Sequence, residues 1–214
     1  MEAGGINLRT LARTVAAVGA VEVGVSLLIA EGRPHPMMLL GAARLLEIFL
    51  IIFMARLGRR DLESLGLSVL GVPYALERGL LWSVGLGLIA AFAWVILDSA
   101  GLHPLTLIRA QLPPDGNDLV LLFVVGGLLG PVAEELFFRG VLYGFFRRWG
   151  APEAVLLSSI LFVLCHPSSY GIRLTQAVGG ILFAVAYEVE RSLLVPITIH
   201  VLGNLAIFSL SLLA

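Results

Sequence analysis

The sequence predicts an all-α fold, a polytopic transmembrane helical bundle with seven to eight spans. Of its 214 residues, 58% are apolar and only 14% are charged, whereas soluble domains carry about 25% charged residues. The mean hydropathy is +0.97. Apolar runs long enough to cross a bilayer recur along the chain, and no lipid-exposed strand or loop survives in the hydrocarbon core. We therefore expect a single transmembrane domain over residues 1–214.

Each predicted span is an apolar run near the length of about 20 residues that crosses the hydrocarbon core. In chain order the runs are 11–30, 37–57, 79–99, 119–147, 152–168, 173–189 and 192–213. The first follows two arginines, as a signal peptide does, but it lacks the usual small-residue cleavage site, so we expect a retained span. Between the second and third runs, Pro73 to Glu77 predicts a short surface helix. Pro196 lets the last run form one kinked helix or two short ones.

The arginines indicate the direction in which the chain crosses, because cytoplasmic loops are enriched in Lys and Arg. If the N-terminus lies in the cytoplasm, only Arg33, Arg109 and Arg173 fall on the outer side of the membrane. The larger set falls on the cytoplasmic side: Arg9, Arg13, Arg56, Arg59, Arg60, Arg78, Arg147, Arg148 and Arg191. The compact, arginine-rich chain indicates a prokaryotic host. We therefore expect an integral protein of the cytoplasmic (inner) membrane with its N-terminus in the cytoplasm.

Three charges stand in the middle of the fourth run, where charged side chains are expensive. Glu135 and Arg139 are four residues apart and share a helix face, so they can form a buried ion pair that fixes the local geometry. Glu134 points about 100° away from that face and is left without this partner. We therefore expect Glu135 to be structural and Glu134 to be reactive, as a general base.

Two of the four histidines lie in apolar runs. His166 comes near the end of the fifth run, and His200 stands four residues before Asn204 on one face of the last run. An imidazole can share a water with Glu134, and an asparagine amide and a second imidazole can donate to a developing oxyanion. These side chains, on three separate helices, are the parts of a water-activating hydrolase for an acyl or peptide bond.

The same residues carry a family resemblance. Three motifs occur in order along the chain: Glu134-Glu135-x-x-x-Arg139, Phe162-x-x-x-His166 and His200-x-x-x-Asn204. This set resembles the CAAX protease and bacteriocin-processing family of intramembrane endopeptidases, which includes the type II CAAX prenyl proteases. The resemblance covers about residues 119–208. It implies an all-helical fold of eight spans and a glutamic-type endopeptidase that cleaves near the C-terminus of a membrane-associated protein or peptide, with or without a lipid anchor.

The resemblance also implies a role for each residue. The water would be activated by Glu134 and His166, and the oxyanion would be stabilised by His200 and Asn204. The expected partners are membrane lipids and a membrane-associated protein or peptide substrate, whereas a net charge of −1 argues against nucleic acid. Supporting roles would fall to Glu135, Arg139 and Phe162.

Other interpretations of the same residues stay open. We expect no cofactor, because Asn204 and the placement of the residues on separate helices fit a metal-free glutamate mechanism. In the alternative, Glu134, His166 and His200 hold a zinc ion with an open position for water. The chain could also be a non-catalytic membrane immunity or scaffold protein. A small transporter or proton carrier is a further alternative, since intramembrane Glu and His build relays, but no inverted repeat is visible in the sequence.

Overall fold

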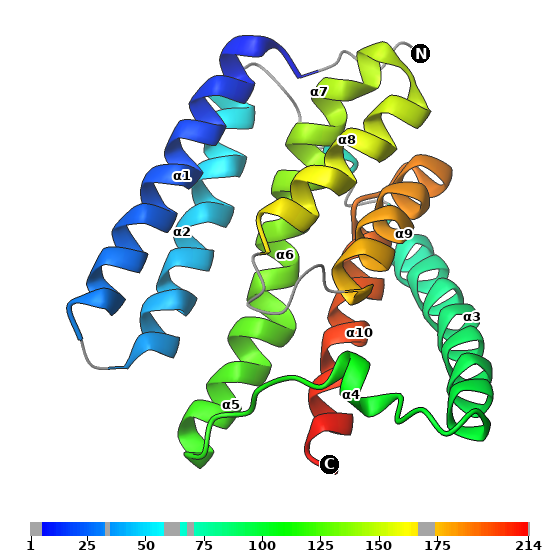
Figure 1. The fold of residues 1–214 in the computed structure, drawn as a ribbon. Coiled ribbons are helices and arrows are strands. Elements are labelled where there is room, and N and C mark those ends of the chain that lie inside the picture. Colours follow the sequence, from blue (N-terminus) through cyan, green and yellow to red (C-terminus); the bar gives the residue numbers. More distant parts are fainter. Residues whose placement is uncertain (1–5, 33–34, 58–64, 68–70, 167–173, 214) are drawn as a thin grey trace.

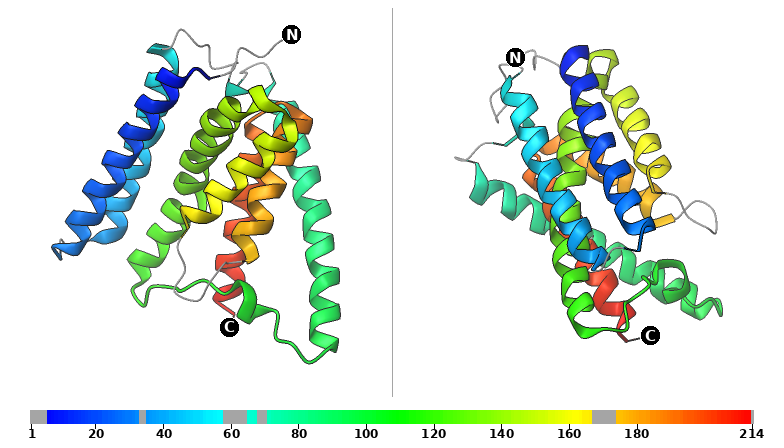
Figure 2. Two further views of the ribbon diagram at one scale, coloured as in Figure 1. Left: turned by 45° about the horizontal axis from the view of Figure 1, so that its top comes forward. Right: turned by 90° about the vertical axis from the view of Figure 1, so that its left-hand side faces the viewer.

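The computed structural model describes residues 6–32, 35–57, 65–67, 71–166 and 174–213, and every regular element within these ranges is a helix. A central helix, Gly116–Trp149, runs through the bundle (Figure 1). The helices around it are α1 (Leu8–Ala30), α2 (Pro36–Leu57), α3 (Val72–Ser99), α4 (Leu105–Ile108), α8 (Ala151–Leu164), α9 (Leu174–Glu190) and α10 (Leu194–Ser211). In the left view of Figure 2, the α1–α2 hairpin and α3 lie on opposite sides of the central helix.

The all-α prediction is confirmed, and each of the seven predicted runs corresponds to a helix. Within the described ranges, five helices are long and apolar enough to cross a membrane: α1, α2, α3, the central helix and α10. By contrast, α8 has 14 residues and α9 has 17. At about 1.5 Å of rise per residue they measure about 21 and 26 Å, short of the ~30 Å hydrocarbon core. The end of the fifth predicted run, at residues 167 and 168, lies outside the described ranges.

Two prolines lie in the first turn of a helix and do not break it. Pro196 lies in the first turn of α10, where the missing N–H has no intrahelical acceptor, so the last run is one continuous helix. Pro73 lies in the first turn of α3. The predicted surface helix at Pro73 to Glu77 is therefore wrong, because these residues begin the third span.

The central helix changes its hydrogen-bonding register twice. A π-helical segment, Val125–Leu129, separates α5 (Gly116–Val124) from α6 (Gly130–Glu135). In this segment the N–H of Gly130 bonds to the carbonyl of Val125, five residues back. The next donor in that register would be residue 131, which is a proline and has no N–H. The carbonyl of Gly126 is therefore left without its backbone donor.

A second π-helical segment, Leu136–Tyr143, runs through the densest part of the bundle, followed by α7 (Gly144–Phe146). Nearly all of its residues are buried. Leu136 and Val141 pack in an apolar cluster with α2, whereas Phe138 and Leu142 pack with α8, α9 and α10. The segment therefore joins the N-terminal hairpin to the C-terminal helices.

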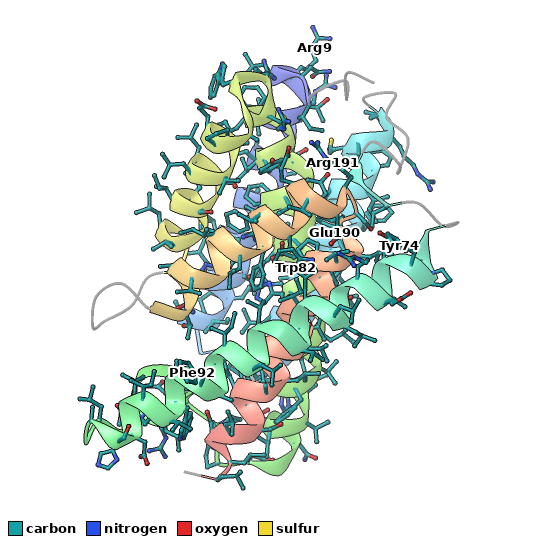
Figure 3. All side chains as sticks on the ribbon, turned by 90° about the vertical axis from the view of Figure 1, so that its right-hand side faces the viewer. Arg9, Tyr74, Trp82, Phe92, Glu190 and Arg191 are labelled. Atoms are coloured by element: carbon teal, nitrogen blue, oxygen red, sulfur yellow. The ribbon has the colours of Figure 1, made fainter. Side chains whose placement is uncertain are left out.

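Helix α3 packs against α10 and α9, and its buried residues, Ala75 and Gly79, lie near its start. At Gly79 it approaches α10 so closely that a Cβ atom would lie 2.6 Å from Cβ of Thr198. Arg78 and Trp82 both donate to the carboxylate of Glu190 at the end of α9. Figure 3 shows Trp82 of α3 beside Glu190. Farther along α3, large apolar side chains such as Phe92 are exposed. This is the surface expected of a helix that faces lipid.

Candidate active site

The structure brings Glu134 and two histidines together. Oε2 of Glu134 lies 3.4 Å from Nε2 of His166 and 3.8 Å from Nε2 of His200. The short length of α8 accounts for this meeting. The helix starts beside the end of the central helix and runs back for about 21 Å, while Glu134 lies about 22 Å before that end. Figure 1 shows the end of α8 reaching the central helix at α6.

The three side chains differ in exposure. The side chains of Glu134 and His166 are 21% and 27% exposed, whereas that of His200 is 7% exposed. Glu134 and His166 are therefore the members of the group that a substrate can reach, and His200 forms the closed side of the site.

Both imidazoles are fixed through Nδ1. The Nδ1 atom of His166 lies 2.6 Å from the carbonyl oxygen of Phe162, and that of His200 lies 2.8 Å from Oε1 of Glu135. Because carbonyl and carboxylate oxygens accept, each Nδ1 carries the proton and donates it. Each ring consequently turns its Nε2 toward Glu134.

The predicted ion pair between Glu135 and Arg139 is present, and both side chains are fully buried. Nη1 of Arg139 donates to Oε1 of Glu135 over 2.8 Å, and this same oxygen accepts from His200. Nη2 of Arg139 donates to the carbonyl of Gly180 in α9 over 2.9 Å. One carboxylate and one guanidinium therefore connect the central helix to α9 and α10. Gly180 could not be predicted from the sequence, because any residue can supply a backbone carbonyl acceptor.

Two phenylalanine rings complete the surroundings of the site. The ring of Phe162 lies 4.4 Å from that of His166. Phe183, which the sequence did not single out, stacks on His200 at 4.5 Å. The guanidinium of Arg139 lies over both phenylalanine rings, at 4.7 and 5.2 Å. Such contacts stabilise a buried cation whose hydrogen bonds are incomplete.

Asn204 lies on the same helix face as His200, as expected, but its observed partner is a backbone group. Its Nδ2 donates over 2.9 Å to the carbonyl of Gly126, the oxygen that Pro131 leaves without a donor. Asn204 therefore fastens α10 to the π-helical segment before Glu134. One of its two amide N–H groups remains for another acceptor.

The carboxylate and the two Nε2 atoms are donor types that zinc accepts. Among the side chains that the structure describes, however, no three of His, Cys, Asp or Glu form a group that could hold a metal ion. The separations of 3.4 and 3.8 Å exceed those of good direct hydrogen bonds. A water placed between the carboxylate and the rings would fit these separations.

Fold and site together define a class of protein: a polytopic membrane protein with a glutamate–histidine site inside its helical bundle. Residues 116–206 match the model of the family described as type II CAAX prenyl endopeptidase Rce1-like. Over this region the chain matches that family, and the resemblance seen in its motifs is confirmed.

Two curated proteins show the same relationship. The chain is 31% identical over 85 residues to the Bacillus subtilis (strain 168) protein named "Putative membrane peptidase YdiL", covering 39% of this chain and 34% of that protein. It is 30% identical over 130 residues to the Escherichia coli protein named "Uncharacterized 24.3 kDa protein", covering 57% of this chain and 59% of that protein. The matches thus span about a third and about three fifths of these relatives. No solved structure matches the chain significantly.

Proposed function

We propose that the protein is a metal-free intramembrane endopeptidase of the glutamic type. Its substrate would be a membrane-associated protein or peptide, with or without a lipid anchor, cleaved near its C-terminus. The observation that carries the proposal is the meeting of the Glu134 carboxylate with the Nε2 atoms of His166 and His200. The match of residues 116–206 to the Rce1-like family model supports protease chemistry at this site.

In the proposed reaction, Glu134 and His166 activate a water held between them. Nε2 of His166 accepts one O–H of the water and aims it, while Glu134 removes the other proton. The water oxygen bonds to the scissile carbonyl carbon as the C=O electrons move to the oxygen. The oxyanion then re-forms the C=O bond, and the C–N bond breaks as Glu134 returns its proton to the leaving amine.

His200 and Asn204 would stabilise the oxyanion. The Nδ1–H of His200 is held by Glu135, so only Nε2 is available to the substrate. Donation from Nε2 requires the doubly protonated form of the ring, which neither gains nor loses a proton during the reaction. The N–H of Asn204 that Gly126 does not use is the second donor. Preorganised donors of this kind are each worth about 10²–10³ in turnover.

The arginines support a cytoplasmic location for one end of the molecule. Arg9 at the start of α1, Arg147 and Arg148 at the end of the central helix and Arg191 after α9 gather at the same end (Figures 1 and 3). Cytoplasmic flanks are enriched in such residues. We place this end in the cytoplasm of a prokaryotic cell.

The proposal is tested by comparing membrane proteomes from cells with the wild-type protein and with Glu134→Gln. We expect C-terminal fragments that depend on Glu134, detected by mass spectrometry. A protein that serves only as a scaffold would give identical fragments in both cells.

Metal dependence is tested on the purified protein in proteoliposomes. We expect cleavage to survive exhaustive chelation. Loss of cleavage that stoichiometric zinc restores would establish the zinc alternative with Glu134, His166 and His200 as ligands.

A further inference from the structure

The α1–α2 hairpin carries an ionic triad in its apolar middle, outside the region that matches the family model. Nη2 of Arg44 in α2 lies 2.5 Å from Oε1 of Glu22 in α1. Nη1 of the same guanidinium lies 2.6 Å from Oε2 of Glu47. The side chain of Glu47 is buried, that of Arg44 is 18% exposed and that of Glu22 is 42% exposed. The triad therefore runs from the protein interior to an accessible surface.

This triad lies beside the candidate active site. Helix α2 approaches the central helix so closely that a Cβ atom at Gly41 would lie 3.0 Å from Cγ2 of Val125. Arg44 follows Gly41 by one turn on α2. The same helix packs against α6, which carries Glu134. Because Arg44 holds Glu22 at 2.5 Å, the triad lies beside the helix segment that carries Glu134.

The triad is short of one positive charge. Two carboxylates share a single guanidinium, and Glu134 adds a further carboxylate nearby. The side chain of Glu47 is almost completely inaccessible, and its Oε1 has no hydrogen-bond partner among the described residues. Surplus negative charge inside a membrane is costly. The accessible Glu22 carboxylate is where an incoming cation can supply the missing positive charge.

We propose that Glu22, supported by Arg44 and Glu47, binds a lysine or arginine side chain of the peptide substrate next to the scissile bond. This inference rests on the proposed endopeptidase function and names a substrate class for it. Glu47 holds Arg44, Arg44 fixes one oxygen of Glu22, and the accessible Glu22 carboxylate receives the basic group. The incoming cation supplies the positive charge that the triad lacks.

The test uses lipid-anchored peptides that carry one lysine at successive positions, each matched with a norleucine peptide that lacks only the ammonium group. With the full-length protein in proteoliposomes, we expect one position at which lysine lowers KM about tenfold, the size of one charge-assisted hydrogen bond. Glu22→Gln should erase this difference, and Glu22→Asp, which keeps the charge, should retain part of it. Glu77→Gln on α3 is the matched control and should preserve it.

Equal KM values for lysine and norleucine at every position would overturn the inference, as would a difference that survives in Glu22→Gln. Binding of the same peptides to Glu134→Gln, followed by thermal shift, separates this inference from the proposed function. Tighter, Glu22-dependent binding of the lysine peptide without any wild-type cleavage would overturn the endopeptidase proposal and keep the subsite. Cleavage without a lysine preference would keep the endopeptidase proposal and overturn the subsite.

Discussion

Glu134 and Glu135 are neighbours in the chain, but their carboxylates lie in different surroundings. Glu135 is fully buried and accepts from Arg139 and His200. Glu134 is partly exposed and faces the Nε2 atoms of two histidines without a close direct hydrogen bond. The difference arises because adjacent helical residues point about 100° apart. Substitution of Glu134 should therefore reduce turnover, whereas substitution of Glu135 should reduce the stability of the fold.

Glu134→Gln should abolish turnover and leave stability nearly unchanged. The amide keeps the size of the side chain but cannot remove a proton from water, and general-base catalysis contributes about 10²–10⁴ in rate. Initial cleavage rates and thermal unfolding in detergent measure both effects. Cys165→Ser, one residue from His166, is the control and should keep wild-type activity. Wild-type turnover in Glu134→Gln would refute the assignment.

Glu135→Gln should instead destabilise the fold by about 3–5 kcal/mol, the usual cost of removing one partner from a buried ion pair. The guanidinium of Arg139 would stay buried without a carboxylate to balance its charge, beside the Gly180 carbonyl, three phenylalanine rings and a neutral amide. Denaturation in detergent measures the loss. In the double variant Glu135→Leu with Arg139→Met, the loss should be smaller than the sum of the two single losses. Unchanged stability in Glu135→Gln would contradict a structural role.

At the scale of elements, the sequence predicted the helices and the partners of the site for separate physical reasons. Apolar runs located the helices, and polar side chains inside those runs located Glu134, His166 and His200. The contact of Asn204 could not be predicted, because it depends on a π-helical register that leaves Gly126 without a donor. Phe183 was missed because one aromatic residue in an apolar run looks like any other until its helix is placed against α10.

Glycines in α3 give an element-scale prediction. Gly79→Ala should destabilise the packing of α3 on α10 by about 1–3 kcal/mol, because the new methyl group would meet Cβ of Thr198 at 2.6 Å. Gly85→Ala in the same helix is the matched control, since nothing lies within 4 Å of its added Cβ. Thermal unfolding of the two variants should separate them. Equal melting temperatures would show that α3 does not rest on α10 at Gly79.

At the scale of the whole molecule, the arginine-rich end sets the proposed direction across the membrane. In a Cys165→Ser background, we expect a membrane-impermeant maleimide added to intact cells to label Leu102→Cys but not Trp149→Cys. Both positions are exposed and lie at opposite ends of the bundle. Labelling of both variants after permeabilisation is the control. Labelling of Trp149→Cys alone in intact cells would invert the topology.

The spacing of the buried charges also bears on how the chain enters the bilayer during synthesis. Arg139 with Glu135 and Arg44 with Glu47 each form an ion pair within one helix. A charged residue such as arginine at the centre of an inserting helix costs about 2.5–3.5 kcal/mol. Each of these pairs can leave the translocon already neutralised, before the later helices have been made. The partners of Glu134, His166 and His200, come later in the chain, after α8 and in α10. The carboxylate that we propose to be reactive therefore enters the bilayer before its partners are synthesised.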